Sequence, residues 1–248
     1  MRLTFAVERA RPGQGRLVAR WIARSLDPSL LPLTIWRSPR AGRYVESLLT
    51  GASRYYLLRR GGVVAGLAAF RRLGCAAFLN HICIGRRWRG RGLGRALLAA
   101  ATARYLDECP ARRVALDAFA GHPAGAWYRR LGFVRQERQG WYTRPCPAPG
   151  GKRFAAPDLA AANRRHRAWG FSSITLGPYT VGRLWAPYFR LTDPAAARDR
   201  DLAGLLALLD PARSLLLVAP TAPRGWTEVA SSERLVCSAD LLLERLHA

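Results

Sequence analysis

The sequence predicts a mixed α/β fold, in which helices cover a central sheet, followed by a smaller C-terminal α+β domain. Three observations support this. Short strand-like runs dominate the front of the chain, strands and helices alternate after them, and a Pro- and Gly-rich stretch, Pro145-Cys-Pro-Ala-Pro-Gly-Gly151, interrupts the pattern. We therefore expect domains over residues 1–145 and 152–248, joined by a linker over residues 146–151.

The elements of the first domain follow from periodicity and turn residues. Gly61-Gly62 suits a tight hairpin turn with positive φ, so strands are expected on both sides of it. Ser38-Pro39 suits the cap and first turn of a helix. In order, the expected elements are a strand over 3–7, helices over 16–26 and to about 49, strands over 54–58, 63–69 and 76–84, a helix through 106, and strands over 113–119 and from 133 onward.

The most informative motif is Arg89-Gly90-Arg91-Gly92-Leu93-Gly94-Arg95, which follows the apolar run from Phe78 to Ile84 and opens an Ala- and Leu-rich helix. The first amides of a helix have no intrahelical partner, and the helix dipole places partial positive charge there. Glycines let the backbone approach a ligand closely. The motif therefore predicts an anion site, such as a phosphate site.

Other phosphate-binding motifs fit less well. A P-loop requires Gly-Lys-Ser/Thr, but the only lysine is Lys152, far from these glycines. A dinucleotide fingerprint requires a third glycine where Arg95 stands, although Asp117 lies where a ribose-binding acid would be expected. An NAD(P)-binding oxidoreductase therefore remains an alternative.

A second motif follows. Pro123 suits the first turn of a short helix, and Gly132 suits its C-terminal cap before a strand begins at Phe133. Together, Arg89-x-x-Gly92-x-Gly94 and Ala124-x-x-Trp127-Tyr128-x-x-x-Gly132-Phe133 resemble the two signature segments of the GNAT superfamily of acyl-CoA N-acyltransferases. The resemblance covers about residues 1–145. It implies a central mixed, mostly antiparallel sheet flanked by helices.

The resemblance also implies an activity, the transfer of an acetyl group from acetyl-CoA to a primary amine by direct attack. In this family the pyrophosphate of the co-substrate sits on the loop amides and the pantetheine arm follows the preceding strand, where a backbone N–H near Cys83 or Ile84 would stabilise the oxyanion. Tyr128 matches the residue that donates to the thiolate sulfur. The implied binding residues are Ile82, Cys83, Ile84, Arg89, Gly90, Arg91, Gly92, Leu93, Gly94 and Arg95.

The general base is less defined. Many relatives carry a glutamate on the strand that contacts pantetheine, but no acidic residue lies between Glu46 and Asp107. His81 has a suitable ordinary pKa and lies two residues before Cys83. Alternatives are Glu46, Asp117, His122, Glu137 and bulk water. Gly121 occupies the position of an asparagine that contacts the cofactor arm in relatives, so that contact is not carried over.

Charge raises a second class of function. The net charge is +24, and residues 1–145 hold 27 basic and 7 acidic residues. Such a field attracts polyanions, and Arg54-Tyr-Tyr-x-x-Arg59-Arg60 interleaves basic and aromatic side chains as single-strand binders do. A nucleic-acid-binding module with a vestigial acyltransferase fold is therefore an alternative. However, with a single lysine among 40 basic residues, a bias toward arginine is the simpler explanation.

The remaining composition argues for a cytoplasmic enzyme without metal or membrane partners. The five cysteines are odd in number and lack metal-ligand spacing, and no apolar run reaches the ~20 residues of a membrane span. The acceptor is a small molecule, a protein amine or an aminoacyl-RNA, and a homo-oligomer is compatible with the sequence.

The C-terminal segment predicts α+β structure. The expected elements are a helix over 156–169, strands over 171–176, 180–191 and 215–218, a helix from Asp193-Pro194 to 209, and a helix over 239–246. This order resembles a degenerate or truncated second copy of the same fold, but it contains no glycine loop after a strand. Such a copy would shape the acceptor pocket, pair two chains or dock a partner.

Overall fold

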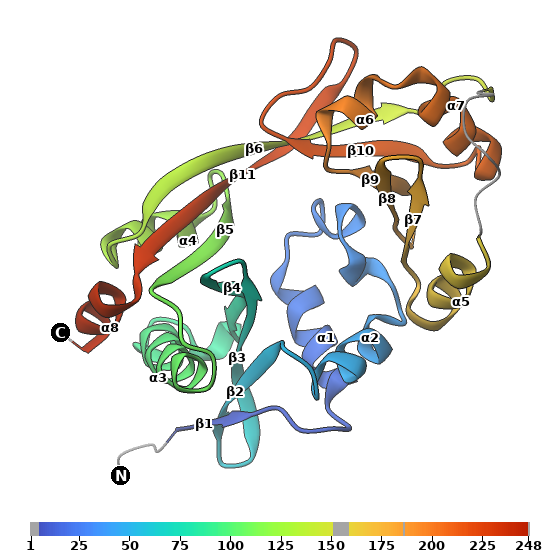
Figure 1. Ribbon diagram of the computed structural model, residues 1–248. Helices are drawn as coiled ribbons and strands as arrows, with labels where there is room; N and C mark the ends of the chain where they lie inside the picture. Colours follow the sequence, from blue (N-terminus) through green and yellow to red (C-terminus); the bar gives the residue numbers. More distant parts are fainter. Residues whose placement is uncertain (1–4, 151–158, 186, 248) are drawn as a thin grey trace. The chain divides into compact units, whose positions relative to one another are not determined.

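The computed structural model describes residues 5–150, 159–185 and 187–247 (Figure 1). They form two compact units. The first contains the described residues within 1–25, 42–137 and 233–248, and the second contains those within 26–41 and 138–232. The units are therefore not the consecutive segments expected on either side of residue 145. Leu3 and Thr4 of the expected first strand, Gly151 of the linker and positions 156–158 of the expected helix lie outside the described residues.

The sheet of the first unit has the strand order β1-β2-β3-β4-β5-β11-β6. Neighbours from β1 to β4 are antiparallel, whereas β5 is parallel to β4. Gly61 and Gly62, with φ of 51° and 79°, close the β2–β3 hairpin, a conformation that favours glycine. The strands are β1 Ala6–Arg9, β2 Arg54–Arg60, β3 Val63–Leu73, β4 Ala76–Ile84, β5 Arg113–Phe119, β6 Val134–Pro145 and β11 Thr227–Ser238.

The helices of the first unit are α1 Gly15–Ser25, α2 Ala41–Leu48, α3 Leu93–Glu108, α4 Pro123–Arg130 and α8 Ala239–His247, with a 3₁₀ turn at Arg86–Trp88. Helix α3 packs on β3 and β4 and against α8 (Figure 1). Its Leu97, Leu98 and Ala101 are fully buried. Because α3 is anchored in this way, its N-terminus is held in place.

Strands β6 and β11 are long, and each contributes to both units. The last residues of β11 lie between β5 and β6 in the first unit, and the last residues of β6 pair with β10 in the second. The core of the first unit therefore includes Leu235 of β11 together with Leu242 and Leu246 of α8. Strand β11 was not expected from the sequence, and its insertion explains why the units are not consecutive.

The second unit has the strand order β6-β10-β9-β8-β7. The expected strand over 180–191 is two antiparallel strands, because the chain turns back at Leu184. The expected helix over 193–209 breaks at Asp199, whose carboxylate caps the second part by accepting from the Leu202 amide at 3.0 Å. The elements are α5 Ala160–Trp169, β7 Ser172–Leu176, β8 Tyr179–Arg183, β9 Tyr188–Leu191, α6 Pro194–Arg198, α7 Arg200–Leu209 and β10 Ser214–Ala219.

The second unit repeats part of the order of the first. Strands β7, β8 and β9 are antiparallel, and β10 returns parallel to β9 after α6 and α7. This matches β2, β3 and β4, followed by α3 and the parallel β5. No helix in the described part of the chain combines the length and hydropathy needed to cross a membrane. The described His, Cys, Asp and Glu residues form no cluster of three that could hold a metal.

Candidate active site

The candidate site begins where β4 and β5 separate. Their parallel pairing runs from Ala76↔Arg113 to Leu79↔Leu116 and extends no further among their described residues, although β4 continues to Ile84 and β5 to Phe119. The register between β3 and β4 also shifts here, because Ala69 pairs with His81 and Phe70 with Leu79. Asn80 is therefore the extra residue of a β-bulge. Bulges of this kind redirect a strand and are common next to active sites.

The separation exposes one edge of β4. Residues 82–84 remain paired with β3, so alternate backbone N–H and C=O groups of this segment form hydrogen bonds with β3. The other alternate groups point toward β5, where the pairing has ended. The end of β4 therefore offers backbone donors and acceptors to an extended ligand.

The glycine loop follows β4 directly. Gly90 and Gly92 both have φ of 73°, and no atom of the described residues lies within 4 Å of the position that a Cβ would occupy on either. Gly92 is the N-terminal cap residue of α3. Arg89 fixes the loop to β4 by donating from Nε to the Ile84 carbonyl at 3.0 Å. The free amides at the start of α3 are thus presented on an open surface, as the anion-site prediction requires.

Helix α4 brings the second sequence motif to the same place. A Cβ built on Gly94 would lie 3.8 Å from Ile84 Cγ1 and 3.9 Å from Trp127 Cζ2. The start of α3, the end of β4 and α4 therefore meet at Gly94. The ring of Tyr128 lies 5.0 Å from that of Trp127 and, edge to face, 5.6 Å from that of Phe133, and only 6% of the residue is exposed.

Tyr128 is protonated at physiological pH. Burial raises the pKa of its hydroxyl, and the nearby Cys83 thiol raises it further. Burial also raises the pKa of the Cys83 thiol to about 11, so this cysteine is not a thiolate.

His81 is half-buried on β4, and its pKa is lowered to about 3 by burial and by the positive charge of Arg71. The imidazole is therefore neutral at physiological pH and can accept a proton, but it is a weak base.

Three of the other candidates for the base have structural partners. The carboxylate of Glu46 accepts from the amides of Gly13 at 2.5 Å and Gly15 at 2.8 Å, and thereby caps α1. His122 caps α4, with Nδ1 accepting from the Ala124 amide at 3.1 Å. Asp117 pairs with both Nε and the terminal nitrogen of Arg234. These three groups are thus engaged in holding the fold.

The structure also bears on the two alternative functions. A dinucleotide fingerprint needs a glycine at the position of Arg95 and a free acid at the position of Asp117. Instead, Arg95 donates from Nε to the Leu246 carbonyl at 3.1 Å, and Asp117 is paired with Arg234. The rings of Tyr55 and Tyr56 are buried and offer no face to a stacking base. The aromatic residues of the motif that suggested nucleic-acid binding are therefore part of the core.

The described residues of the second unit lack the features of this site. Its β9 stays paired with β10 up to its last residue, through Leu191↔Leu217, and only Thr192 and Asp193 separate β9 from α6. Neither an opening between the parallel strands nor a glycine loop is present there. The candidate site belongs to the first unit alone.

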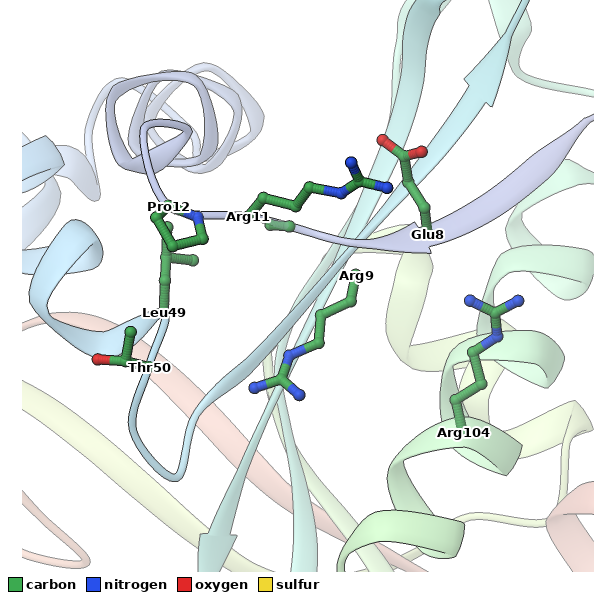
Figure 2. Close-up of a pocket in the computed structure, with 8 residues that line it drawn as sticks. Glu8, Arg9, Arg11, Pro12, Leu49, Thr50 and Arg104 are labelled. Atoms are coloured by element: carbon green, nitrogen blue, oxygen red, sulfur yellow. The ribbon is translucent and has the colours of Figure 1, made fainter.

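A hollow of about 600 Å³ lies elsewhere in the first unit (Figure 2). The figure shows Glu8, Arg9, Arg11 and Pro12 near β1, Leu49 and Thr50 after α2, and Arg104 on α3. Glu8 pairs with Arg59, and Arg9 with Glu108 at 3.2 Å. None of the sequence-predicted site residues lines this hollow, so we do not assign it to the reaction.

Sequence reasoning missed two features of the site. The bulge at Asn80 depends on the pairing of β3 with β4, which no local pattern shows. Trp88, just before the glycine loop, has three guanidinium carbons near its ring: that of Arg60 at 4.9 Å, Arg87 at 5.0 Å and Arg91 at 5.8 Å. The excess of arginine in the sequence is the only signal that could have pointed to this cluster.

Comparison with known families identifies the class. Residues 21–133 match the family model described as acetyltransferase (GNAT) family. This segment is therefore similar to GNAT acetyltransferases, a family whose members support acyl transfer in general. No significant match was found among curated protein sequences.

Solved structures share the fold along nearly the whole chain. A tandem GNAT protein from the clavulanic acid biosynthesis pathway is 14% identical with a TM-score of 0.63, covering 95% of this chain and 99% of its own. The GCN5-related N-acetyltransferase from Sphaerobacter thermophilus is 16% identical with a TM-score of 0.59, covering 95% and 96%. That from Kribbella flavida is 15% identical with a TM-score of 0.54, covering 94% and 71%. The likeness thus extends well beyond residue 145.

Proposed function

We propose that the protein is an N-acetyltransferase that moves an acetyl group from acetyl-CoA to a primary amine by direct attack. The observation that carries the proposal is the end of β4–β5 pairing after Leu79↔Leu116, immediately before an open glycine loop at the start of α3. An extended thioester needs a polar strand edge for its arm and a nearby anion site for its phosphates. The first unit places these two features next to each other in the chain.

In this proposal the co-substrate phosphates lie on the loop from Arg89 to Arg95. The amides of Arg91, Gly92, Gly94 and Arg95 would contact the pyrophosphate, and the side chains of Arg89 and Arg91 would add positive charge. Gly90, Gly92 and Gly94 leave room for the backbone to approach it. The pantetheine arm would pair with Ile82, Cys83 and Ile84.

The reaction itself balances as a simple substitution. The amine nitrogen attacks the thioester carbonyl carbon, and a β4 amide near Cys83 stabilises the oxyanion. The tetrahedral species then breaks its C–S bond. The Tyr128 hydroxyl donates a hydrogen bond or a proton to the departing sulfur, which leaves as free CoA. The nitrogen loses one proton and becomes an amide. Because the Cys83 thiol is protonated, transfer through an acyl-cysteine is disfavoured.

The departing amine proton needs an acceptor. His81 is the remaining sequence candidate on β4, and its neutral imidazole would accept the proton directly or through a water. An imidazole with a pKa of about 3 is a poor acceptor for the proton of a free ammonium group, but the attacking nitrogen becomes more acidic once it has bonded to the carbonyl carbon. His81 would therefore act after attack rather than before it.

Calorimetric titration tests the proposal first. Acetyl-CoA, ATP and NADP are titrated in parallel at moderate salt, because a chain with a net charge of +24 attracts any polyanion. Saturable one-site binding of acetyl-CoA alone, followed by thiol release in the presence of amines, is the expected result. Equal and salt-sensitive binding of all three would contradict it and favour the nucleic-acid alternative.

A further inference from the structure

A basic and aromatic cluster lies on one face of the first unit's sheet, beside the β4–β5 opening. We call it the Arg71 cluster; its members are Tyr44, Tyr55, Arg71, Phe78 and His81. Tyr44 belongs to α2, and strand pairing fixes the placement of the other four, since Tyr55 pairs with Ala69, Ala69 with His81, and Arg71 with Phe78. None of the mechanistic steps above uses Arg71, Tyr44 or Tyr55.

The cluster is on the face away from α3. Ala77, Leu79 and Ile82 belong to or pack on the core that α3 covers, so the intervening Phe78 and the residues after the bulge, His81 and Cys83, face the other way. Cys83 Sγ lies 4.0 Å from the Trp21 carbonyl of α1, which confirms the direction. An acceptor that approaches on this side reaches the opening from the face opposite to α3.

Two guanidinium groups lie against the buried ring of Phe78. Arg71 Cζ is 4.8 Å and Arg234 Cζ is 5.2 Å from the ring centroid. Stacking on a buried ring holds a long side chain in one place. Arg234 is neutralised by Asp117, with which it makes two hydrogen bonds.

Arg71 differs from Arg234, because no described carboxylate forms an ion pair with it. Its charge acts on the groups around it: it lowers the pKa of His81 and partly offsets the burial that raises the pKa of Tyr44 and Tyr55. Its side chain is exposed to solvent. A fixed, exposed and uncompensated guanidinium is a site for an anion.

We infer that the amine acceptor carries an anionic group, a carboxylate or a phosphate, that binds Arg71 while the amine enters the β4–β5 opening. This rests on the proposed function and names the acceptor class for the same site. Phe78 and Cys83 are five residues apart along β4, and one of the residues between them is in a bulge. At about 3.3 Å per residue, four to five residues span about 13–17 Å. The long arginine side chain covers part of this span. The acceptor therefore has several bonds between its amine and its anionic group.

An acceptor series tests the inference. At saturating acetyl-CoA, thiol release is measured with ω-amino carboxylates of increasing length, with ω-aminoalkyl phosphates, and with length-matched neutral ω-amino amides. We expect at least one anionic amine to exceed its neutral counterpart by about tenfold or more in kcat/KM. The carboxylate and phosphate arms show which anion is preferred.

Variants link the preference to the residue. R71Q is expected to lower kcat/KM for the anionic amine about tenfold, with R71K intermediate, while the neutral amine and the acetyl-CoA Kd change less than twofold. R72Q is the matched control, since Arg72 is the next residue of β3, is exposed and donates to the Gly74 carbonyl at 3.2 Å. Equal use of anionic and neutral amines, or equal effects of R71Q and R72Q, would overturn the inference and leave the proposed function standing. Acetyl-CoA binding without acetylation of any amine would overturn both.

Discussion

Replacing Tyr128 with phenylalanine isolates the proposed role of one hydroxyl. The ring is buried between Trp127 and Phe133, at centroid distances of 5.0 and 5.6 Å, and phenylalanine preserves these contacts. We expect the fold to lose less than about 1.5 kcal/mol. A hydrogen bond to a charged group contributes about 1.5–3 kcal/mol, so its loss from a developing thiolate lowers kcat roughly 10- to 150-fold.

Two assays measure this effect. Thiol release gives kcat, and calorimetry gives the acetyl-CoA Kd, which should stay within about twofold because the hydroxyl acts mainly on the leaving group. Tyr105→Phe is the control: Tyr105 is also fully buried, but it stacks on Phe70 at 5.1 Å in the second half of α3, away from the glycine loop. A kcat for Tyr128→Phe equal to that of the control would refute the assigned role.

Three further predictions concern the loop, a cap and pH. Gly92→Glu and Gly92→Gln both place a side chain at a φ of 73°, so they share the same backbone strain. Only the glutamate directs a negative charge at the phosphates. Calorimetry should therefore show the acetyl-CoA affinity falling about 100-fold with Glu and clearly less with Gln. Glu46→Ala removes the cap on α1 and should cost about 1–2 kcal/mol in urea unfolding, with kcat nearly unchanged; a collapse of kcat at retained stability would instead identify Glu46 as the base. His81 has a folded-state pKa of about 3, below its ordinary 6.5, so the unfolded chain binds the proton first and stability falls as pH drops from about 6.5 toward 3. His81→Gln should make the midpoint of urea unfolding depend less on pH in that window. An unchanged dependence would contradict the lowered pKa.

Local elements could be predicted from the sequence because their signals are local. The apolar runs of β4 and β5 and the Gly61-Gly62 turn define those strands without reference to the rest of the chain. The glycine loop and α4 are similarly visible, since glycine, proline and apolar spacing mark them directly. These elements supply the proposed co-substrate site.

Strand β11 was missed for a physical reason. Its sequence, Thr-Glu-Val-Ala-Ser-Ser-Glu-Arg-Leu-Val-Cys-Ser, is polar over its first half, and its apolar residues gather only near its end. It becomes a strand because it enters between β5 and β6, more than 80 residues away in the chain. Tertiary pairing decided what local propensity did not indicate.

The proposed acceptor side of the site was hidden for the same reason. Arg71, Phe78 and Arg234 come from three strands, and only their register brings two guanidinium groups to one ring. Glu46 and His122 looked like bases because their chemistry suits that role, but each caps a helix that the sequence had already predicted. The first amides of each helix need acceptors, and in these two helices Glu46 and His122 supply them.

The insertion of β11 also determines how much of the chain the candidate site needs. Leu235, Leu242 and Leu246 are buried in the core on which α3 packs, and burying each leucine contributes about 1.5–3 kcal/mol. Together they contribute roughly 5–9 kcal/mol, comparable to the whole stability of a typical domain, about 5–15 kcal/mol. Residues 1–145 produced alone should therefore lack a cooperative thermal transition and fail to bind acetyl-CoA, although they contain both sequence motifs. Adding residues 146–248 as a separate chain should restore both properties, because it returns β11 and α8. A cooperative transition for residues 1–145 alone would show that the first unit is complete without them.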